Sequence, residues 1–274
     1  MNPQATLAAF DEQVRRSPRP EEPGARAERI GDIARHVAPN RDGWSGVVWS
    51  SLDEGSADAA IAEQARYFTA LGQKVEWKLY DYDLPGDLPG RLLARGFVPE
   101  PEEALMVAEI AELALDVAPP PGIDLIPVTD EAGVDRVVRV HEEVFGVDHA
   151  WLGRALRAQV AETPPPVAAV VAMDGEAPVC SARVALPRDG EFASLWGGGT
   201  LPAYRGRGIY RAVVAHRAKI ARERGFRYVY LDARPESRAI LERVGFVKLA
   251  IITPFVLDPA RGYHRPAPAG RAAG

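Results

Sequence analysis

Apolar residues recur along this chain at two spacings, and the two spacings alternate. Leu7, Phe10 and Val14 lie three or four residues apart, as on one face of a helix, whereas residues 44–52 form a β-branched and aromatic run. These patterns predict an α/β arrangement for the first half. Its helices are expected over 1–16, 26–37, 56–71 and 88–95, and its strands over 44–52, 75–82 and 104–110.

The second half alternates in the same way, after a stiff connection at Pro119-Pro120-Pro121-Gly122. We therefore expect one domain over 1–118, a second over 119–258, and a disordered tail over 259–274, which is rich in Ala, Pro, Gly and Arg. Strands are predicted over 123–129, 167–173, 177–186, 191–201 and 226–232, and helices over 130–145, over 146–160, from about Gly208, and just before Gly245-Phe246.

The two halves repeat one order of elements. In each, a helix ends at a glycine, a strand and a turn follow, and a short helix ends in Gly-Phe before another strand. The glycines are Gly72 and Gly96 in the first half and Gly225 and Gly245 in the second. This order indicates an internal duplication. The alternative is coincidence, because a helix–strand order is common.

Composition narrows the function classes. The 274 residues are 47% hydrophobic and 26% charged, as in globular proteins of one large or two smaller domains. The net charge of -5 disfavours sequence-independent nucleic-acid binding. One cysteine and five scattered histidines offer neither a disulfide nor a metal-ligand spacing. With no long apolar run and no secretory pattern, a cytoplasmic protein without membrane contact is expected.

The candidate chemistry lies where the strand ending near Thr200 meets the helix that begins near Gly208. Arg205 and Arg207 alternate there with Gly206 and Gly208. Backbone N–H groups at a helix N-terminus attract anions, and glycines let a phosphate approach the main chain closely. A dinucleotide fingerprint would need glycine where Arg211 stands, and no Gly-Lys-Ser or Gly-Lys-Thr of a nucleotidase loop is present.

At these residues the chain resembles the GNAT superfamily of acyl-CoA-dependent N-acyltransferases. Arg205 and Gly208 match its pyrophosphate signature, although Tyr210 replaces the last small residue, and 240–246 resembles its second signature, a helix ending in Gly-Phe. The resemblance implies two N-acyltransferase-like domains, each a mixed, mostly antiparallel sheet flanked by helices, with acetyl-CoA as cosubstrate. The first copy carries acids in the turn over 51–57, so we expect it to be degenerate and without cofactor.

The resemblance also assigns roles within the second copy. The family's strand separates from its neighbour and directs a backbone amide at the thioester carbonyl; by position that amide belongs to Gly198. The run 197–199 suits close approach to a ligand, or a strand bulge without a partner. The residues expected to hold the cofactor are Thr200, Leu201, Arg205, Gly206, Arg207, Gly208, Ile209 and Tyr210.

The expected acid and base are missing. The family's usual glutamate position falls near Ser194, whose hydroxyl could orient a water, and its usual tyrosine position is Leu241. Tyr210 and Glu236, with Tyr204 nearby, are the remaining polar candidates, each with a surface or packing role as the alternative. His141, with Glu142 and Glu143, could line the acceptor pocket or simply occupy a helix face, and Cys180 is expected to be a buried apolar residue.

The resemblance predicts transfer of an acetyl group from acetyl-CoA to an amine, carried by a small molecule or a peptide, by direct attack in a ternary complex. One alternative is a regulatory module that binds CoA without turnover, because the acid and base are absent. Another is transfer of a longer acyl group. The acceptor and the oligomeric state are left open.

Overall fold

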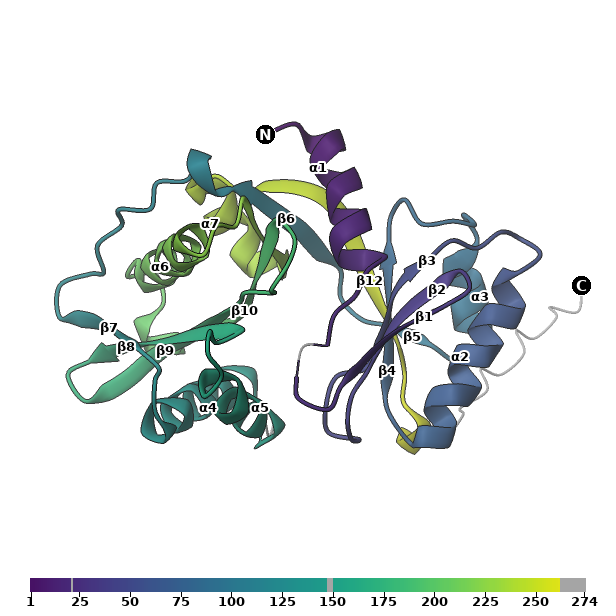
Figure 1. The fold of residues 1–274 in the computed structure, drawn as a ribbon, viewed down its shortest axis with the longest axis horizontal. Helices are drawn as coiled ribbons and strands as arrows, with labels where there is room; N and C mark the ends of the chain where they lie inside the picture. Colours follow the sequence, from purple (N-terminus) through teal and green to yellow (C-terminus); the bar gives the residue numbers. More distant parts are fainter. Residues whose placement is uncertain (21, 147–149, 262–274) are drawn as a thin grey trace, which may run out of the picture.

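A single sheet joins two lobes in the computed structural model, which describes residues 1–20, 22–146 and 150–261 (Figure 1). In spatial order its strands are β1 (Arg26–Ile30), β2 (Ile33–Val37), β3 (Gly46–Ser50), β4 (Val75–Tyr80), β12 (Val247–Leu257), β6 (Glu103–Glu109), β11 (Tyr228–Ala233), β10 (Phe192–Thr200), β9 (Ala177–Ala185), β8 (Val167–Asp174) and β7 (Ile123–Pro127), with β5 (Val98–Pro99) paired to β12. We call the part built on β1–β5 the N-terminal lobe and the part built on β6–β11 the C-terminal lobe.

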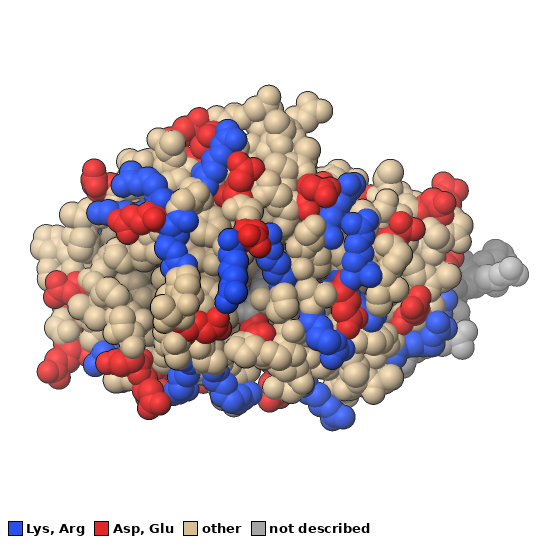
Figure 2. Space-filling view, viewed as in Figure 1, with Lys and Arg blue, Asp and Glu red and all other residues tan. Residues whose placement is uncertain are grey.

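Helices cover the sheet in both lobes. The N-terminal lobe carries α2 (Ala57–Leu71) and α3 (Leu88–Ala94). In the C-terminal lobe, α6 (Ile209–Glu223) and α7 (Pro235–Val244) lie on one face, and α4 (Glu131–Phe145) and α5 (Ala150–Val160) on the other (Figure 1). Between the lobes lies α1 (Pro3–Phe10), which continues into a π-helical turn over Asp11–Arg15. Figure 2 shows Lys and Arg side chains interspersed with Asp and Glu side chains across this view of the surface.

The lobes exchange their last strands. From the N-terminal half of the sequence, β6 pairs with β11 of the C-terminal lobe. From the end of the sequence, β12 pairs with β6 along its first half and with β4 along its second. The expected fold, a mixed and mostly antiparallel sheet with flanking helices in a tandem arrangement, is thus confirmed, whereas the residue limits 1–118 and 119–258 stay a prediction.

The predicted helix over 26–37 is wrong, because these residues form the β1–β2 hairpin. Ile30 pairs with Ile33 across a two-residue turn, in which Gly31 adopts φ +57°. A glycine with positive φ matches the twist of a tight hairpin, so the turn overrides the helical spacing of Ile30, Ile33 and Val37. The tail is described only to Arg261, with a 3₁₀ turn over Pro259–Arg261; the rest of that expectation lies outside the described residues.

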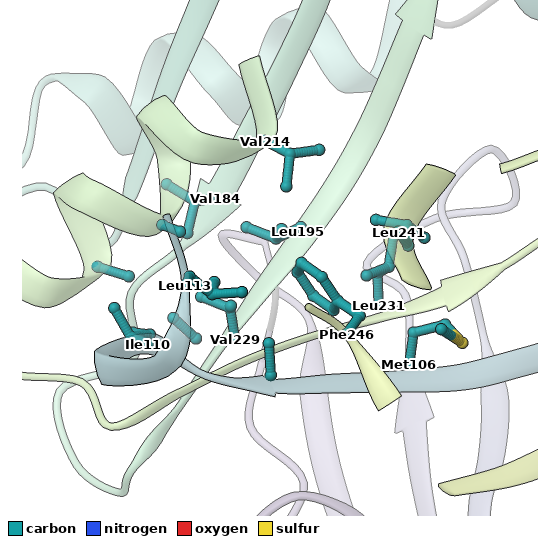
Figure 3. Close-up of a cluster of buried hydrophobic side chains, with 14 of the residues drawn as sticks. Met106, Ile110, Leu113, Val184, Leu195, Val214, Val229, Leu231, Leu241 and Phe246 are labelled. Carbon is teal, nitrogen blue, oxygen red and sulfur yellow. The ribbon is translucent and has the colours of Figure 1, made fainter. Parts of the chain in front are cut away.

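The core of the C-terminal lobe includes residues from both halves of the sequence. In Figure 3, Met106 and Ile110 pack with Leu195 and Phe246 beneath the helices. Because β6 contributes to this core, the C-terminal lobe cannot bury its apolar surface without a strand of the N-terminal half. Other members of the cluster are Leu113, Val184, Val214, Val229, Leu231 and Leu241.

Candidate functional site

The turn between β10 and α6 leaves its backbone amides open. Gly206 and Gly208 adopt φ +75° and φ +87°, which lets the chain turn sharply before Ile209. A Cβ at Gly206 would meet nothing within 4 Å, and at Gly208 only Pro120 Cγ at 3.9 Å. No side chain caps α6, and within the described part of the chain no acceptor bonds the amides of 206–208. The free amides at a helix N-terminus form an anion-binding geometry.

Two arginines flank this turn. Arg205 Nε donates to the Thr200 carbonyl at 3.1 Å, which ties the turn to the end of β10. The guanidinium of Arg207 lies 5.0 Å from the centre of the Tyr204 ring and 3.9 Å from Asp174 Oδ2. Both arginines are exposed, so their charge adds to the positive end of α6 while their side chains can still move.

β10 and β11 separate beside this turn. They pair with each other only from Phe192 to Ser194; beyond this point β10 continues to Thr200 paired with β9, and β11 continues to Ala233 paired with β6. Opposite β9, β10 carries a bulge between Trp196 and Gly199, with φ +57° at Gly197. A bulge is therefore present on the side of β10 that pairs with β9, while the opposite edge of the strand, toward β11, is open at these residues. Whether the Gly198 amide acts on a carbonyl stays a prediction.

The three glycines of the bulge let helices pack closely on both faces of the strand. A Cβ on Gly198 would lie 3.1 Å from Tyr210 and 3.2 Å from Arg217, both on α6. A Cβ on Gly199 would lie 2.8 Å from Val144, on α4. The side chain of His141 also packs here, 3.2 Å from a Cβ built on Gly197. Larger residues at these positions would force the helices apart.

Arg217 was missed from the sequence. Its side chain is fully buried, and Nη1 donates to the carbonyls of Arg183 at 3.1 Å and Trp196 at 3.4 Å, at the start of the bulge. Burial lowers the pKa of its guanidinium. The available signal was a lone cation in the apolar face of α6, between Val214 and Ala218. The bulge disrupts the hydrogen-bond ladder between β9 and β10, and Arg217 donates to two of the backbone carbonyls beside it.

A cavity of about 540 Å³ lies between the lobes. Ser194 and Trp196 of β10, and Tyr230 and Asp232 of β11, line one side, so the cavity reaches both edges of the strand separation. Residues of β2–β4 line another side, and the segment that follows α1 lines a third. Such a volume accommodates a small molecule. We call this cavity the central pocket; its aromatic lining consists of Phe10, Trp44, Tyr80, Phe192, Trp196 and Tyr230.

Ionisable side chains gather at the edge of the central pocket. Lys78 of β4 reaches across the sheet to form an ion pair with Asp232 of β11, and both side chains are almost fully buried. Burial acts to lower the pKa of Lys78, but the carboxylates of Asp232 and Glu76 outweigh it and raise that pKa well above its ordinary value. Burial, followed by the charge of Asp232, raises the pKa of Glu103 to about 7.

Comparison with known families identifies one part of the chain. Residues 134–246 match the acetyltransferase (GNAT) family. This part of the chain belongs to the GNAT family. The match stops short of the N-terminal lobe, as expected for a degenerate GNAT copy. None of the curated proteins compared with the chain matches its sequence.

Solved structures show the same fold over nearly the whole chain. One is a GCN5-related N-acetyltransferase from Kribbella flavida, with a TM-score of 0.67 and 18% identity over 93% of each chain. Another is a functionally unknown conserved protein from Staphylococcus epidermidis, with a TM-score of 0.66 and 12% identity over 91% of this chain and 97% of that one. A tandem GNAT protein from the clavulanic acid biosynthesis pathway gives 0.61 and 12% over 88% and 85%.

The candidate catalytic residues lie in different surroundings within the GNAT fold. Ser194 lines the central pocket, and its hydroxyl accepts a 2.7 Å hydrogen bond from Trp196 Nε1. Tyr210 lies against the bulge, where burial raises the pKa of its hydroxyl. Glu236 is exposed on the first turn of α7, and Leu241 is fully buried in the core. Cys180 is buried, as expected, and accepts from the Thr200 hydroxyl at 3.3 Å.

The described residues offer neither a helix that could span a membrane nor a cluster of metal ligands. Among them, no helix is both long and apolar enough to cross a membrane. Within the same ranges, His, Cys, Asp and Glu side chains do not gather in groups of three that could hold a metal ion.

Proposed function

We propose that this chain is an N-acetyltransferase that binds acetyl-CoA at the β10–α6 turn and acetylates an amine held in the central pocket. The observation that carries this proposal is the separation of β10 from β11. The central pocket lies where the two strands part, and the open amides of 206–208 follow the end of β10. Acetyl-CoA needs an anion site for its diphosphate and a path that brings its thioester to the acceptor. A cytoplasmic location stays part of this proposal.

The residues present fit the cosubstrate. The amides of the turn, with the guanidinium groups of Arg205 and Arg207, would hold the diphosphate. The free edge of β10 beyond Ser194, ending at Thr200 and Leu201, would hydrogen-bond the pantetheine arm. The backbone N–H of Gly198 would polarise the thioester carbonyl, because Gly198 lies in the part of β10 that no longer pairs with β11. The cofactor set is completed by Gly206, Gly208, Ile209 and Tyr210.

The reaction would then proceed by direct attack. The neutral amine forms a C–N bond with the carbonyl carbon, the C–S bond breaks, and the proton that the amine loses passes to the CoA sulfur, so that CoA leaves as the thiol. Tyr210 keeps its proton at neutral pH, so it can serve as a donor but not as a base. Ser194 receives its hydrogen bond from Trp196, which leaves the hydroxyl proton available to an acceptor group or a water in the central pocket. The exposure of Glu236 favours a surface role.

The second candidate is a CoA-binding module without turnover. It is favoured by Ser194 and Leu241, which occupy the positions of the family's usual base and acid. A third, transfer of a longer acyl group, would use the same turn and strand. Release of CoA thiol from acetyl-CoA across a panel of amines distinguishes enzyme from module, and longer acyl-CoA donors in the same assay test the third.

The experiment on the binding site is calorimetry with CoA. The unaltered protein is expected to bind, and Arg205→Ala is expected to weaken binding by about 10-fold or more, as for loss of a charge-assisted hydrogen bond. The matched control is Arg222→Ala, which removes the same charge from the exposed last turn of the same helix. Absence of CoA binding by the unaltered protein, or an equal effect of both variants, would refute the site.

A further inference from the structure

Asp232 presents a free carboxylate oxygen at the strand separation. It lies on β11 two residues beyond Tyr230, the last residue of β11 that pairs with β10, and it lines the central pocket. Its side chain is only 5% exposed. Oδ2 accepts from Lys78 Nζ, whereas the buried Oδ1 has no hydrogen-bond partner. A buried carboxylate oxygen without a donor costs free energy, so this position calls for a cationic or N–H partner.

The surroundings of Asp232 carry more negative than positive charge. Lys78 is the buried cation of this cluster, and it is influenced by the carboxylates of both Asp232 and Glu76. Glu103 adds a third carboxyl, whose nearest cation, Arg234, is exposed and 3.8 Å away. Burial is the main reason that the pKa of Glu103 is raised, and the negative charge of Asp232 is the second. A further cation would reduce the repulsion among the three carboxyl groups.

Aromatic rings border the same place. Lys78 Nζ lies 5.4 Å from the centre of the Trp44 ring and 5.3 Å from that of the Trp196 ring. Both rings line the central pocket, as does Tyr230, two residues before Asp232. Faces of aromatic rings attract cations and bury flat apolar groups. The cavity beside Asp232 therefore suits a molecule with a cationic end and an aromatic or apolar body.

We propose that Asp232 Oδ1 binds the ammonium group of the acceptor, which releases one proton to water before the neutral amine attacks the thioester, and that the acceptor is a primary amine attached to an aromatic or similarly flat apolar body. This inference rests on the proposed acetyltransferase function. Lys78 is the positioning residue: because it holds Oδ2, Oδ1 is the carboxylate oxygen left without a donor in a side chain that lines the central pocket. Since Lys78 belongs to β4, the degenerate N-terminal lobe would orient the acceptor of the reaction.

Binding of two matched probes tests this assignment without turnover. The probes are 2-phenylethylamine and 2-phenylethanol, which share a body and differ in the charged group, each titrated into the CoA-saturated protein and into the protein alone. The unaltered protein is expected to bind the amine at least about 10-fold more tightly than the alcohol, as for a hydrogen bond to a charged group. Asp232→Asn is expected to abolish that preference while leaving the affinity for the alcohol unchanged.

Two further variants control the experiment. Asp189→Asn removes a carboxylate from an exposed loop of the same cavity and should change neither affinity by more than about twofold. If Asp232→Asn does not fold, Lys78→Gln replaces it: the amide can still donate to Oδ2, and loss of the competing charge should strengthen amine binding several-fold.

The outcomes separate this inference from the proposed function. Equal affinities for amine and alcohol, binding of neither probe at millimolar concentration, a preference that survives Asp232→Asn, or unchanged amine binding in Lys78→Gln would each overturn the role of Asp232. Preference for the amine in a protein that does not bind CoA would leave the amine site standing and remove the acetyltransferase. CoA binding without amine preference would do the reverse.

Discussion

The two lobes reach the start of a long helix by the same route, yet they treat the helix N-terminus differently. Before α2, Asp53 Oδ1 accepts from the Ser56 amide at 2.8 Å and from the Ser56 hydroxyl at 2.7 Å. The carbonyl of Asp53 accepts from the Ala57 amide at 3.1 Å. Before α6, two glycines and two arginines leave the amides free. The N-terminal lobe therefore supplies its own anion where the C-terminal lobe keeps a place for one.

The preceding strands differ in the same sense. After β10 has separated from β11, it contains three consecutive glycines. The corresponding part of β3 consists instead of Val48, Trp49 and Ser50. Arg15 then closes the N-terminal counterpart: its Nε donates to the Val48 carbonyl at 3.0 Å, just beyond the last pair of β3 with β4, and its guanidinium lies 3.7 Å from the centre of the Tyr80 ring. The same fold thus has an open corner in the C-terminal lobe and a filled corner in the N-terminal lobe, and a few side chains make the difference.

The largest effect is expected from placing the same acid at both corners. Gly208→Glu combines a strained positive φ with a carboxylate beside the diphosphate, so CoA affinity should fall by about 100-fold or more. Gly55→Glu, in the turn before α2, should leave CoA affinity within about twofold. Calorimetry measures both, and equal losses would show that the two corners do not differ as proposed.

A smaller effect is expected from filling the β10 bulge. Gly198→Ala places a methyl group 3.1 Å from Tyr210 and 3.2 Å from Arg217, which should lower the free energy of unfolding by about 1–3 kcal/mol. Gly90→Ala, inside α3 with nothing within 4 Å of the new Cβ, should raise it by about 0.5–1 kcal/mol. Denaturant titration of both variants checks the signs; a neutral Gly198→Ala would contradict close packing of α6 on β10.

The smallest effect is expected from removing the acid of the N-terminal lobe. Hydrogen bonding from Ser56 lowers the pKa of Asp53 below its ordinary value of 3.8, so this carboxylate stabilises the fold above that pH and loses its contribution as the pH falls through the lowered pKa. Asp53→Ala should reduce the thermal midpoint by a few degrees at pH 7 and by less toward pH 3. CoA affinity should not change. A midpoint difference that grows on acidification would contradict this role.

Local chemistry explains which parts could be predicted from the sequence. The turn at 205–208 was recognisable because, before a helix, glycine lets an anion approach the main chain and arginine adds positive charge. The β1–β2 hairpin was not, because Ile30, Ile33 and Val37 also fit a helical face, and only Gly31 distinguishes the two. The amides of this turn are open because no other part of the described chain packs on them, and no local sequence pattern reveals such long-range packing.

Long-range arrangement explains the rest. The apolar run over 247–257 would look the same whichever sheet it joined, so the exchange of β6 and β12 left no local signal. The central pocket brings Lys78 beside Asp232, two residues that are separated by most of the chain. Arg217 was visible only as a lone cation in an apolar helix face, and its carbonyl partners depend on a bulge in another strand.

Because each lobe borrows its final strand from the other, neither copy can be lost by a simple truncation. Removing residues 1–109 would take β6 with them and leave β11 with an unpaired edge, while ending the chain before β12 would expose β4. On the proposal that the N-terminal copy binds no cosubstrate, this copy would be retained because the C-terminal lobe needs its strand, while its side chains at the central pocket could still change.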